Sequence, residues 1–156
     1  MTKRSTELRM FKTTTFKTVF FALSLSLFPL SLAAETASIE EQKKFEDKKW
    51  VIQSITKDEK ETYKGLHLGF IKFSNGSIEG QSTCNIYDGV FSVGKDQTIQ
   101  FFRIGVTQVI CNVGNKMAIE QAYTEGLEQV KTYKFEDDQL VLFKKGKKEF
   151  ARFKVK

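Results

Sequence analysis

Two cysteines, Cys84 and Cys111, are the residues whose type and spacing say most about chemistry. They lie 27 positions apart, whereas reactive redox pairs usually lie close together as Cys-x-x-Cys beside the start of a helix. A zinc site is disfavoured as well, because His67 is the only histidine and there is no third thiol. In an exported protein we therefore expect a structural disulfide between the two cysteines.

Three residues that follow the first cysteine are candidates for ligand binding: Asn85, Tyr87 and Asp88. Asn and Asp beside a glycine, here Gly89, most often fix a loop through hydrogen bonds from their side chains to the backbone. The alternative is a polar rim with one aromatic ring, suited to binding a peptide or a glycan. Fixing the loop is the favoured interpretation, and the binding rim stays open.

A second candidate binding surface is a run of lysines near the C-terminus, Lys144, Lys145, Lys147 and Lys148, placed around Gly146. Its simplest interpretation is the solvated turn of a hairpin, where water relieves the repulsion between like charges. As a functional patch it would favour anionic envelope polymers or phospholipid head groups, with binding that depends strongly on salt.

No recognisable catalytic or cofactor motif accompanies these residues. His67 lies one position off the apolar alternation of Leu66, Leu68 and Phe70, so we expect it on the opposite face of its strand. A surface histidine is favoured over a catalytic one, because no serine or cysteine nucleophile has a recognisable motif around it. The glycine-rich patterns that bind nucleotide phosphates are absent from the sequence. We expect no cofactor, no metal and no enzymatic activity.

The first 33 residues are typical of an export signal. Residues 1–17 hold five Lys or Arg against one Glu, and residues 18–32 are apolar. This apolar run is shorter than the ~20 residues of a membrane-spanning helix, although an uncleaved anchor is the alternative. Ser31 and Ala33 fit the small-x-small rule, which predicts cleavage after Ala33 or Ala34 and a periplasmic or secreted product.

Removing this leader changes the charge of the chain. The formal charge of +6 falls to +2 over the remaining 123 residues. That length suits one domain, and the near balance of charge removes the main argument for nucleic-acid binding. We expect a monomer with no stable membrane insertion after cleavage, and a partner that is an envelope component or a secreted protein.

The remaining chain reads as a polar arm followed by short strands and one helix. The arm, residues 34–49, is expected to be a linker or a short frayed helix. Helical spacing of apolar residues predicts a helix near residues 115–130, with Asn115 as its N-cap and Gly126 allowing close approach to a sheet. The expected class is α+β: an antiparallel β-rich single domain of about seven to eight short strands, covered by this helix on one face. The expected strands are 50–55, 66–73, 78–82, 89–93, 98–104, 131–135, 139–143 and 149–155.

Residues 50–156 resemble the META domain family, which includes HslJ-like heat-shock proteins. The resemblance rests on Trp50 at the first strand, the Asn75-Gly76 turn, the segment Thr83-Cys84-Asn85-x-Tyr87-x-Gly89, Thr107 four residues before Cys111, the 120–127 helix and Leu140-Val141-Leu142. Thr83 stands where the family usually has Gly, and Val109-Ile110 where it usually has Met-Ala, with the spacing kept.

The resemblance implies an exported, stress-associated module with no established enzymatic activity and no agreed active site. The first functional hypothesis is a non-enzymatic domain that acts in envelope or stress homeostasis by binding an envelope component or a protein partner. The alternatives are an inhibitor or accessory partner of a secreted or host hydrolase, and an unrecognised hydrolase.

Overall fold

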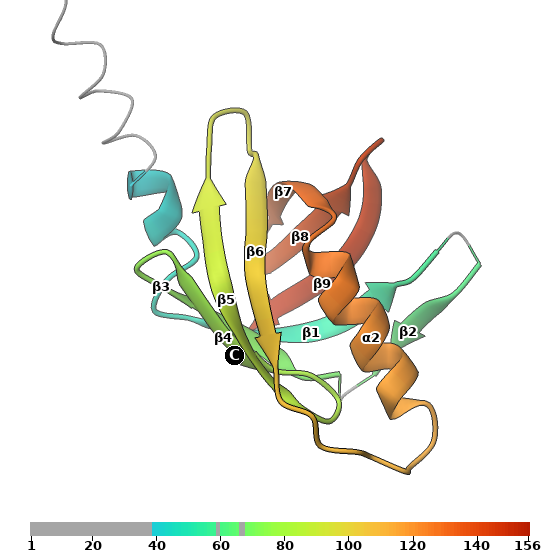
Figure 1. Ribbon diagram of the computed structural model, residues 1–156. Helices are drawn as coiled ribbons and strands as arrows, with labels where there is room; N and C mark the ends of the chain where they lie inside the picture. The colour runs from blue at the N-terminus through green and yellow to red at the C-terminus, as the bar shows by residue number, and fades with distance from the viewer. Residues whose placement is uncertain (1–38, 59, 66–67) are drawn as a thin grey trace, which may run out of the picture.

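The computed structural model describes residues 39–58, 60–65 and 68–156, and these residues form a nine-stranded antiparallel sheet that curls into a half-barrel (Figure 1). The predicted export signal and His67 lie outside the described residues. The strands are β1 (Lys49–Thr56), β2 (Thr62–Lys64), β3 (Phe70–Ser74), β4 (Ser77–Gln81), β5 (Ile86–Val93), β6 (Ile99–Val106), β7 (Val130–Glu136), β8 (Gln139–Lys144) and β9 (Lys148–Val155), and the helix α2 spans Lys116–Leu127.

The strands follow the order β6-β5-β4-β3-β1-β9-β8-β7, and β2 pairs with β1. The first and last strands of this order, β6 and β7, meet where β6 begins. There Thr98 forms an isolated bridge with Thr132, and the backbone N–H of Tyr133 donates to the carbonyl of Gln97 at 2.9 Å. The curl therefore closes on itself at the start of β6, while α2 packs against the inside of the sheet farther along (Figure 1).

The β3–β4 hairpin turns at Asn75 and Gly76, as the Asn-Gly pair predicts. Both residues have positive φ, 48° and 79°, and Ser74 pairs with Ser77 across them. A two-residue turn with positive φ at both positions matches the right-handed twist of the flanking strands. The predicted C-terminal meander is likewise present as β7, β8 and β9.

Helix α2 lies close to β9, as the glycine in it suggested. A Cβ atom at Gly126 would overlap the ring of Phe150, so only glycine allows this approach. Asn115 occupies the N-cap position, as predicted, and its side chain makes no capping hydrogen bond. The buried apolar side chains of the helix are Ile119, Tyr123 and Leu127.

The structure corrects the predicted register of the third strand. β3 begins at Phe70, and the core side chains are Ile71 and Phe73, while Phe70 is only partly buried. Both faces of this stretch carry apolar residues, so the alternation alone was compatible with either register. A further difference is the short strand β2, which was not expected. Residues 39–43 form a short helix, in agreement with one of the two interpretations of the arm.

The described part of the N-terminal arm is not a linker. Phe45 is fully buried, with its ring 4.8 Å from Tyr133, 5.1 Å from Phe73 and 5.0 Å from Phe135 between centroids. The indole N–H of Trp50 donates to the carbonyl of Phe45 at 2.9 Å. Residues from the arm therefore complete the aromatic core.

None of the helices in the described ranges is long and apolar enough to cross a lipid bilayer.

Candidate functional site

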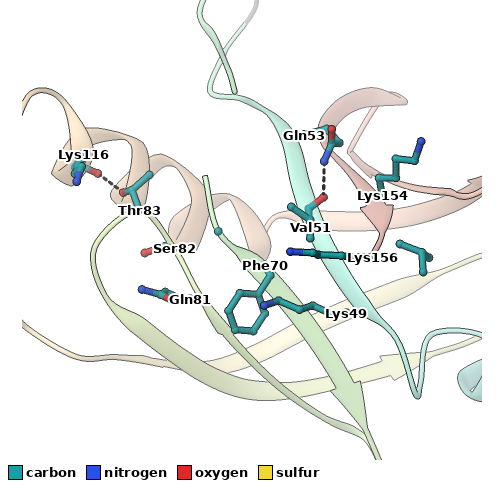
Figure 2. Close-up of a pocket in the computed structure, with 12 residues that line it drawn as sticks. Lys49, Val51, Gln53, Phe70, Gln81, Ser82, Thr83, Lys116, Lys154 and Lys156 are labelled. Carbon is teal, nitrogen blue, oxygen red and sulfur yellow. Dashed lines mark hydrogen bonds between the residues drawn. The ribbon is translucent and has the colours of Figure 1, made fainter. Parts of the chain in front are cut away.

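A recess of about 640 Å³ lies on the outer face of the sheet, across β4, β3, β1 and β9 (Figure 2). Four lysines are among its lining residues, together with the ring of Phe70 and the side chains of Gln53, Gln81 and Thr83. Its position follows from β1, where Trp50 and Ile52 point into the core. The residues that alternate with them point outward and line the recess: Lys49, Val51 and Gln53. The lysines that line the recess are Lys49, Lys116, Lys154 and Lys156.

The predicted lysine turn between β8 and β9 is present, but its members do not form one uniform patch. Lys145 and Lys147 are exposed at the tip, and Lys148 pairs with Lys144 across the hairpin. Lys144 is partly buried, and its Nζ lies 4.8 Å from the centroid of the Phe150 ring. This burial lowers the pKa of Lys144 below its ordinary value.

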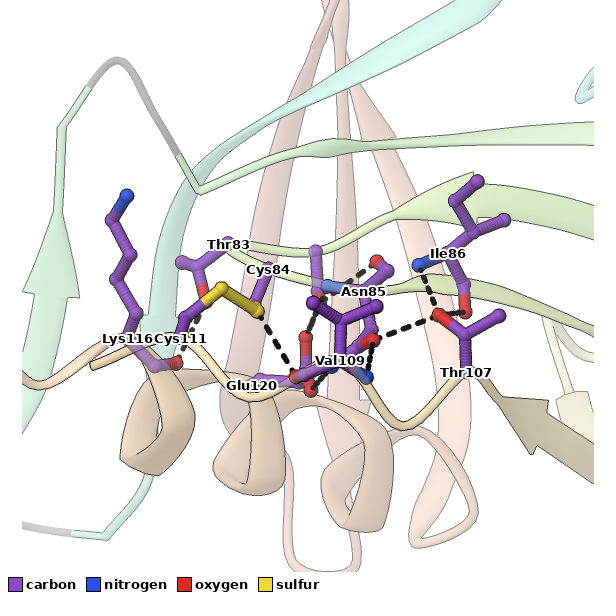
Figure 3. Close-up of a disulfide and its surroundings, with 10 residues drawn as sticks. Thr83, Cys84, Asn85, Ile86, Thr107, Val109, Cys111, Lys116 and Glu120 are labelled. Carbon is purple, nitrogen blue, oxygen red and sulfur yellow. Dashed lines mark hydrogen bonds between the residues drawn. A yellow bond between two sulfur atoms is a disulfide. The ribbon is translucent and has the colours of Figure 1, made fainter. Parts of the chain in front are cut away.

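The predicted disulfide between Cys84 and Cys111 is present, with the two Cα atoms 6.2 Å apart (Figure 3). Cys84 lies in the connection between β4 and β5, and Cys111 lies in the connection between β6 and α2. The bond therefore ties together two connections at the same end of the sheet.

Asn85 holds the same two connections together from the inside. Its Oδ1 accepts from the backbone N–H of Val109 at 2.7 Å and from the hydroxyl of Thr107 at 2.8 Å. Its Nδ2 donates to the carbonyl of Val109 at 3.0 Å and to Glu120 at 2.7 Å. With 2% of its surface exposed, Asn85 fixes a loop, which is the favoured sequence interpretation, and is closed to a ligand.

Glu120, from α2, is the buried charge at the centre of this network (Figure 3). Its carboxylate accepts from the backbone N–H of Asn85 at 2.7 Å, from the Asn85 amide and from the hydroxyl of Ser82. Burial alone would raise the pKa of Glu120, but the bonds from Ser82, Asn85 and the backbone of Cys84 and Asn85 together hold it below its ordinary value. The carboxylate is therefore ionised at neutral pH and links α2 to the β4–β5 connection.

Sequence reasoning missed the role of Glu120. The available signal was its spacing: Glu120, Tyr123 and Leu127 lie at i, i+3 and i+7, which places the carboxylate on the buried face of the helix.

Tyr87 and Asp88 do not join Asn85 in an exposed rim. Tyr87 is 1% exposed, and its hydroxyl bonds with that of Tyr123 at 2.7 Å and donates to the carbonyl of Phe70 at 3.0 Å. Burial raises the pKa of Tyr87 well above its ordinary value, so the pair is neutral. Asp88 is exposed on the other face of β5, as alternation along a strand requires. Neither Asn85 nor Tyr87 lines the recess.

The surface over this network is apolar, which sequence reasoning also missed. Ile110 is 77% exposed, and five of the seven exposed large apolar side chains in the described residues lie in or beside the loop that Cys111 closes. We call this surface the disulfide-loop surface; its residues are Ile86, Val109, Ile110, Val113 and Met117.

Within the described ranges, no three His, Cys, Asp or Glu side chains gather in an arrangement that could hold a metal ion.

Comparison with solved structures supports the fold. A DUF4847 family protein from Bacteroides vulgatus ATCC 8482 is similar, with a TM-score of 0.53 and 17% identity over 73% of this chain and 96% of that chain. A protein from Burkholderia xenovorans, solved by NMR, is similar with a TM-score of 0.59 and 18% identity over 75% of this chain and 87% of that chain. At such identities the likeness concerns the fold alone.

A search of curated protein sequences found no match. The family model of the META domain, in contrast, matches residues 43–156. The match begins two residues before Phe45, in agreement with the packing of that ring in the core. The chain therefore belongs to the META domain family.

Proposed function

We propose that this chain is an exported, non-enzymatic META-type domain that acts in envelope or stress homeostasis by binding a protein partner. The disulfide supports an oxidising compartment outside the cytoplasm, and the basic and apolar leader in the sequence agrees with export. The observation that carries the proposal is the disulfide-loop surface, because its large apolar side chains face solvent on a loop that is fixed from within.

The loop is fixed at two neighbouring points. Cys111 is bonded covalently to Cys84, and the backbone N–H and carbonyl of Val109 are both held by Asn85. The side chains of Val109 and Ile110 are 58% and 77% exposed all the same. A loop that is already ordered loses less conformational entropy when it binds, so more of the apolar burial contributes to affinity. Contiguous exposed apolar residues of this kind mark protein-binding surfaces.

The same observation favours a second candidate, an inhibitor or accessory partner of a secreted or host hydrolase. The apolar residues Val109 and Ile110 follow each other on a segment without helix or strand structure, directly before the disulfide-bonded Cys111. A short ordered loop of this shape suits the cleft of an enzyme, where one or two apolar side chains act as anchors in pockets.

The experiment is chemical crosslinking and co-purification of the full chain from periplasmic extract of its own cells. It compares the wild type with the double variant Val109→Ser, Ile110→Ser, and uses Ile39→Ser as the matched control because Ile39 is exposed away from the loop. We expect a stoichiometric partner with the wild type and the control, reduced at least tenfold with the double variant. Equal recovery of every partner with all three proteins would contradict the proposal.

The identity of the partner separates the two candidates. If it is a hydrolase whose turnover falls when the purified wild-type chain is added, and not when the double variant is added, the inhibitor is the correct function. A broad hydrolase screen of the purified chain tests the non-enzymatic part. Turnover by the chain itself would contradict it.

A further inference from the structure

The recess on the outer face of the sheet differs from its surroundings in how its charges are paired. Elsewhere on this face Lys72 pairs with Glu79 at 3.0 Å, and Arg152 pairs with Glu136 at 2.8 Å and with Glu149 at 2.7 Å. Of the recess lysines only Lys154 has such a partner, Asp138 at 3.1 Å.

Within the described residues, the other three recess lysines form no ion pair with a carboxylate side chain, and Lys49 also lines a neighbouring recess that holds Asp47, Glu79 and Asp88. In the described part of the chain, no Asp or Glu lines the recess or forms an ion pair with Lys49, Lys116 or Lys156. The backbone N–H of Lys156 donates to the carbonyl of Lys49 at 3.1 Å, so these two residues are neighbours. An anion between such cations would gain attraction from each of them and relieve their mutual repulsion.

The recess offers more than charge. Lys49 Nζ lies 4.0 Å from the centroid of the Phe70 ring, which places one cation over the aromatic floor (Figure 2). Lys116 stands across the recess from Lys49 and Lys156 (Figure 2). A ligand that contacts both sides therefore needs at least two acidic groups, joined by a polar body that the neutral side chains of Gln53 and Gln81 can reach.

The backbone beneath the recess disfavours an acidic peptide as this ligand. β1 is already paired on both sides, with Val51 opposite Phe70 of β3 and opposite Lys154 of β9. A peptide that binds a sheet gains affinity from main-chain hydrogen bonds at a free edge, and the floor of the recess is not an edge. A ligand held here depends on side chains alone, which suits hydroxyl and acid groups on sugar rings.

We propose that this recess binds an acidic glycan, a short oligosaccharide whose sugars carry carboxylate or phosphate groups. Lys49 and Lys156 hold one acidic group and Lys116 holds another, while Phe70 and the two glutamines contact the sugar rings between them. The ammonium group of lysine is a compact charge that pairs with a carboxylate or with a phosphate. This site is separate from the disulfide-loop surface and does not depend on the protein partner proposed above.

The test is isothermal titration of the full chain with four probes at two salt concentrations: trigalacturonic acid, its methyl ester, a phosphorylated maltose and pentaglutamate. We expect the wild type to bind at least one of the two acidic sugars, with affinity that falls as salt rises, and to bind the neutral methyl ester at least tenfold more weakly than the free acid. Absence of binding by both acidic sugars would overturn the proposal. Binding of pentaglutamate as tight as that of the acidic sugar would overturn it in favour of a peptide.

Two triple variants with the same loss of charge complete the test. The recess variant Lys49→Gln, Lys116→Gln, Lys156→Gln should weaken binding at least tenfold. The control Lys43→Gln, Lys95→Gln, Lys131→Gln changes exposed lysines outside the recess and outside the lysine turn, and should change binding less than twofold. Equal weakening in both would mean that net charge alone attracts the ligand and would overturn the site. Phe70→Leu should weaken binding of the sugar severalfold. An unchanged affinity would show that the Phe70 ring is not part of the site.

Discussion

The opposite ends of β4 and β5 are held together by different chemistry. At the end next to the β3–β4 turn, the ring of Phe45 fills the space between Phe73, Phe91 and Tyr133, and the curled sheet closes on itself. At the other end, the disulfide, the Asn85 amide and the Glu120 carboxylate join two connections and α2. One end depends on apolar packing and the other on a covalent bond with a satisfied polar network.

This difference bears on function. Apolar packing stabilises the Phe45 end by removing its side chains from water, so little of that end is left to contact a partner. A polar network fixes geometry and can leave apolar side chains outside it, as at Val109 and Ile110. We therefore expect changes at the Phe45 end to affect stability most, and changes over the disulfide to affect binding.

The largest effect on stability should come from Phe45→Ala. Deleting a fully buried phenylalanine removes its apolar burial and leaves a cavity, which lowers the free energy of unfolding by about 3–5 kcal/mol. Urea denaturation measures this change, with Ile39→Ala, an exposed apolar residue nearby, as the control at under about 0.5 kcal/mol. A loss below about 1 kcal/mol for Phe45→Ala would mean that the arm does not belong to the core.

Removing the disulfide should have the next largest effect. The double change Cys84→Ser, Cys111→Ser frees a loop with a sequence separation of 27, which lowers the free energy of unfolding by about 3 kcal/mol in the chain-entropy view. Thiol counting under denaturing conditions verifies the bond first. Two free thiols in the exported wild-type protein would show that no covalent bond holds this end of the sheet.

Glu120→Gln tests the charge in the polar network. The change should lower the free energy of unfolding at pH 7 by about 1–3 kcal/mol, because a buried carboxylate that accepts several hydrogen bonds is replaced by a neutral amide. The pKa of Glu120 is lower in the folded protein than its ordinary value of 4.5. Its contribution is therefore complete above that value and is lost as pH falls through the folded pKa.

Urea denaturation at pH 7 and at pH 3 measures this difference. The gap between wild type and Glu120→Gln should narrow at the lower pH, whereas Glu125→Gln, an exposed carboxylate on the same helix, should leave little gap at either pH. A gap that stays constant with pH would show that the charge of Glu120 is not what holds α2.

The smallest effect should come from the lysine turn, outside both ends. Changing Lys145 and Lys147 to Ser should shift the free energy of unfolding by less than about 1 kcal/mol, since exposed charges contribute little. Thermal melts and binding to anionic vesicles at low salt measure the outcome. If the wild type binds the vesicles and this variant does not, while the melting temperature is unchanged, the functional surface lies at the turn.

Much of the disulfide end could be predicted from sequence, because its signals are local. The spacing of Cys84 and Cys111, the polar residue Asn85 beside them and Gly126 on the helix each carry their meaning in a short window. The turn at Asn75 and Gly76 is local in the same sense.

The Phe45 end could not be predicted in this way. Phe45 is one apolar residue in a polar segment, and its partners Tyr133 and Phe135 lie far along the chain, so no local pattern indicates its burial. Glu120 was missed for a similar reason, because its partner Ser82 lies 38 positions away. The register of β3 was misjudged because apolar residues occupy both faces of the strand.

The proposed function requires the loop before Cys111 to be held rigid from within while its side chains face solvent. Amide hydrogen exchange at Val109 tests this most directly, because its N–H donates to the Asn85 side chain and to no strand partner. We expect slow exchange at Val109 in the oxidised wild type and exchange at least tenfold faster in Asn85→Ala. Fast exchange at Val109 in the oxidised wild type, equal to that of the variant, would contradict it.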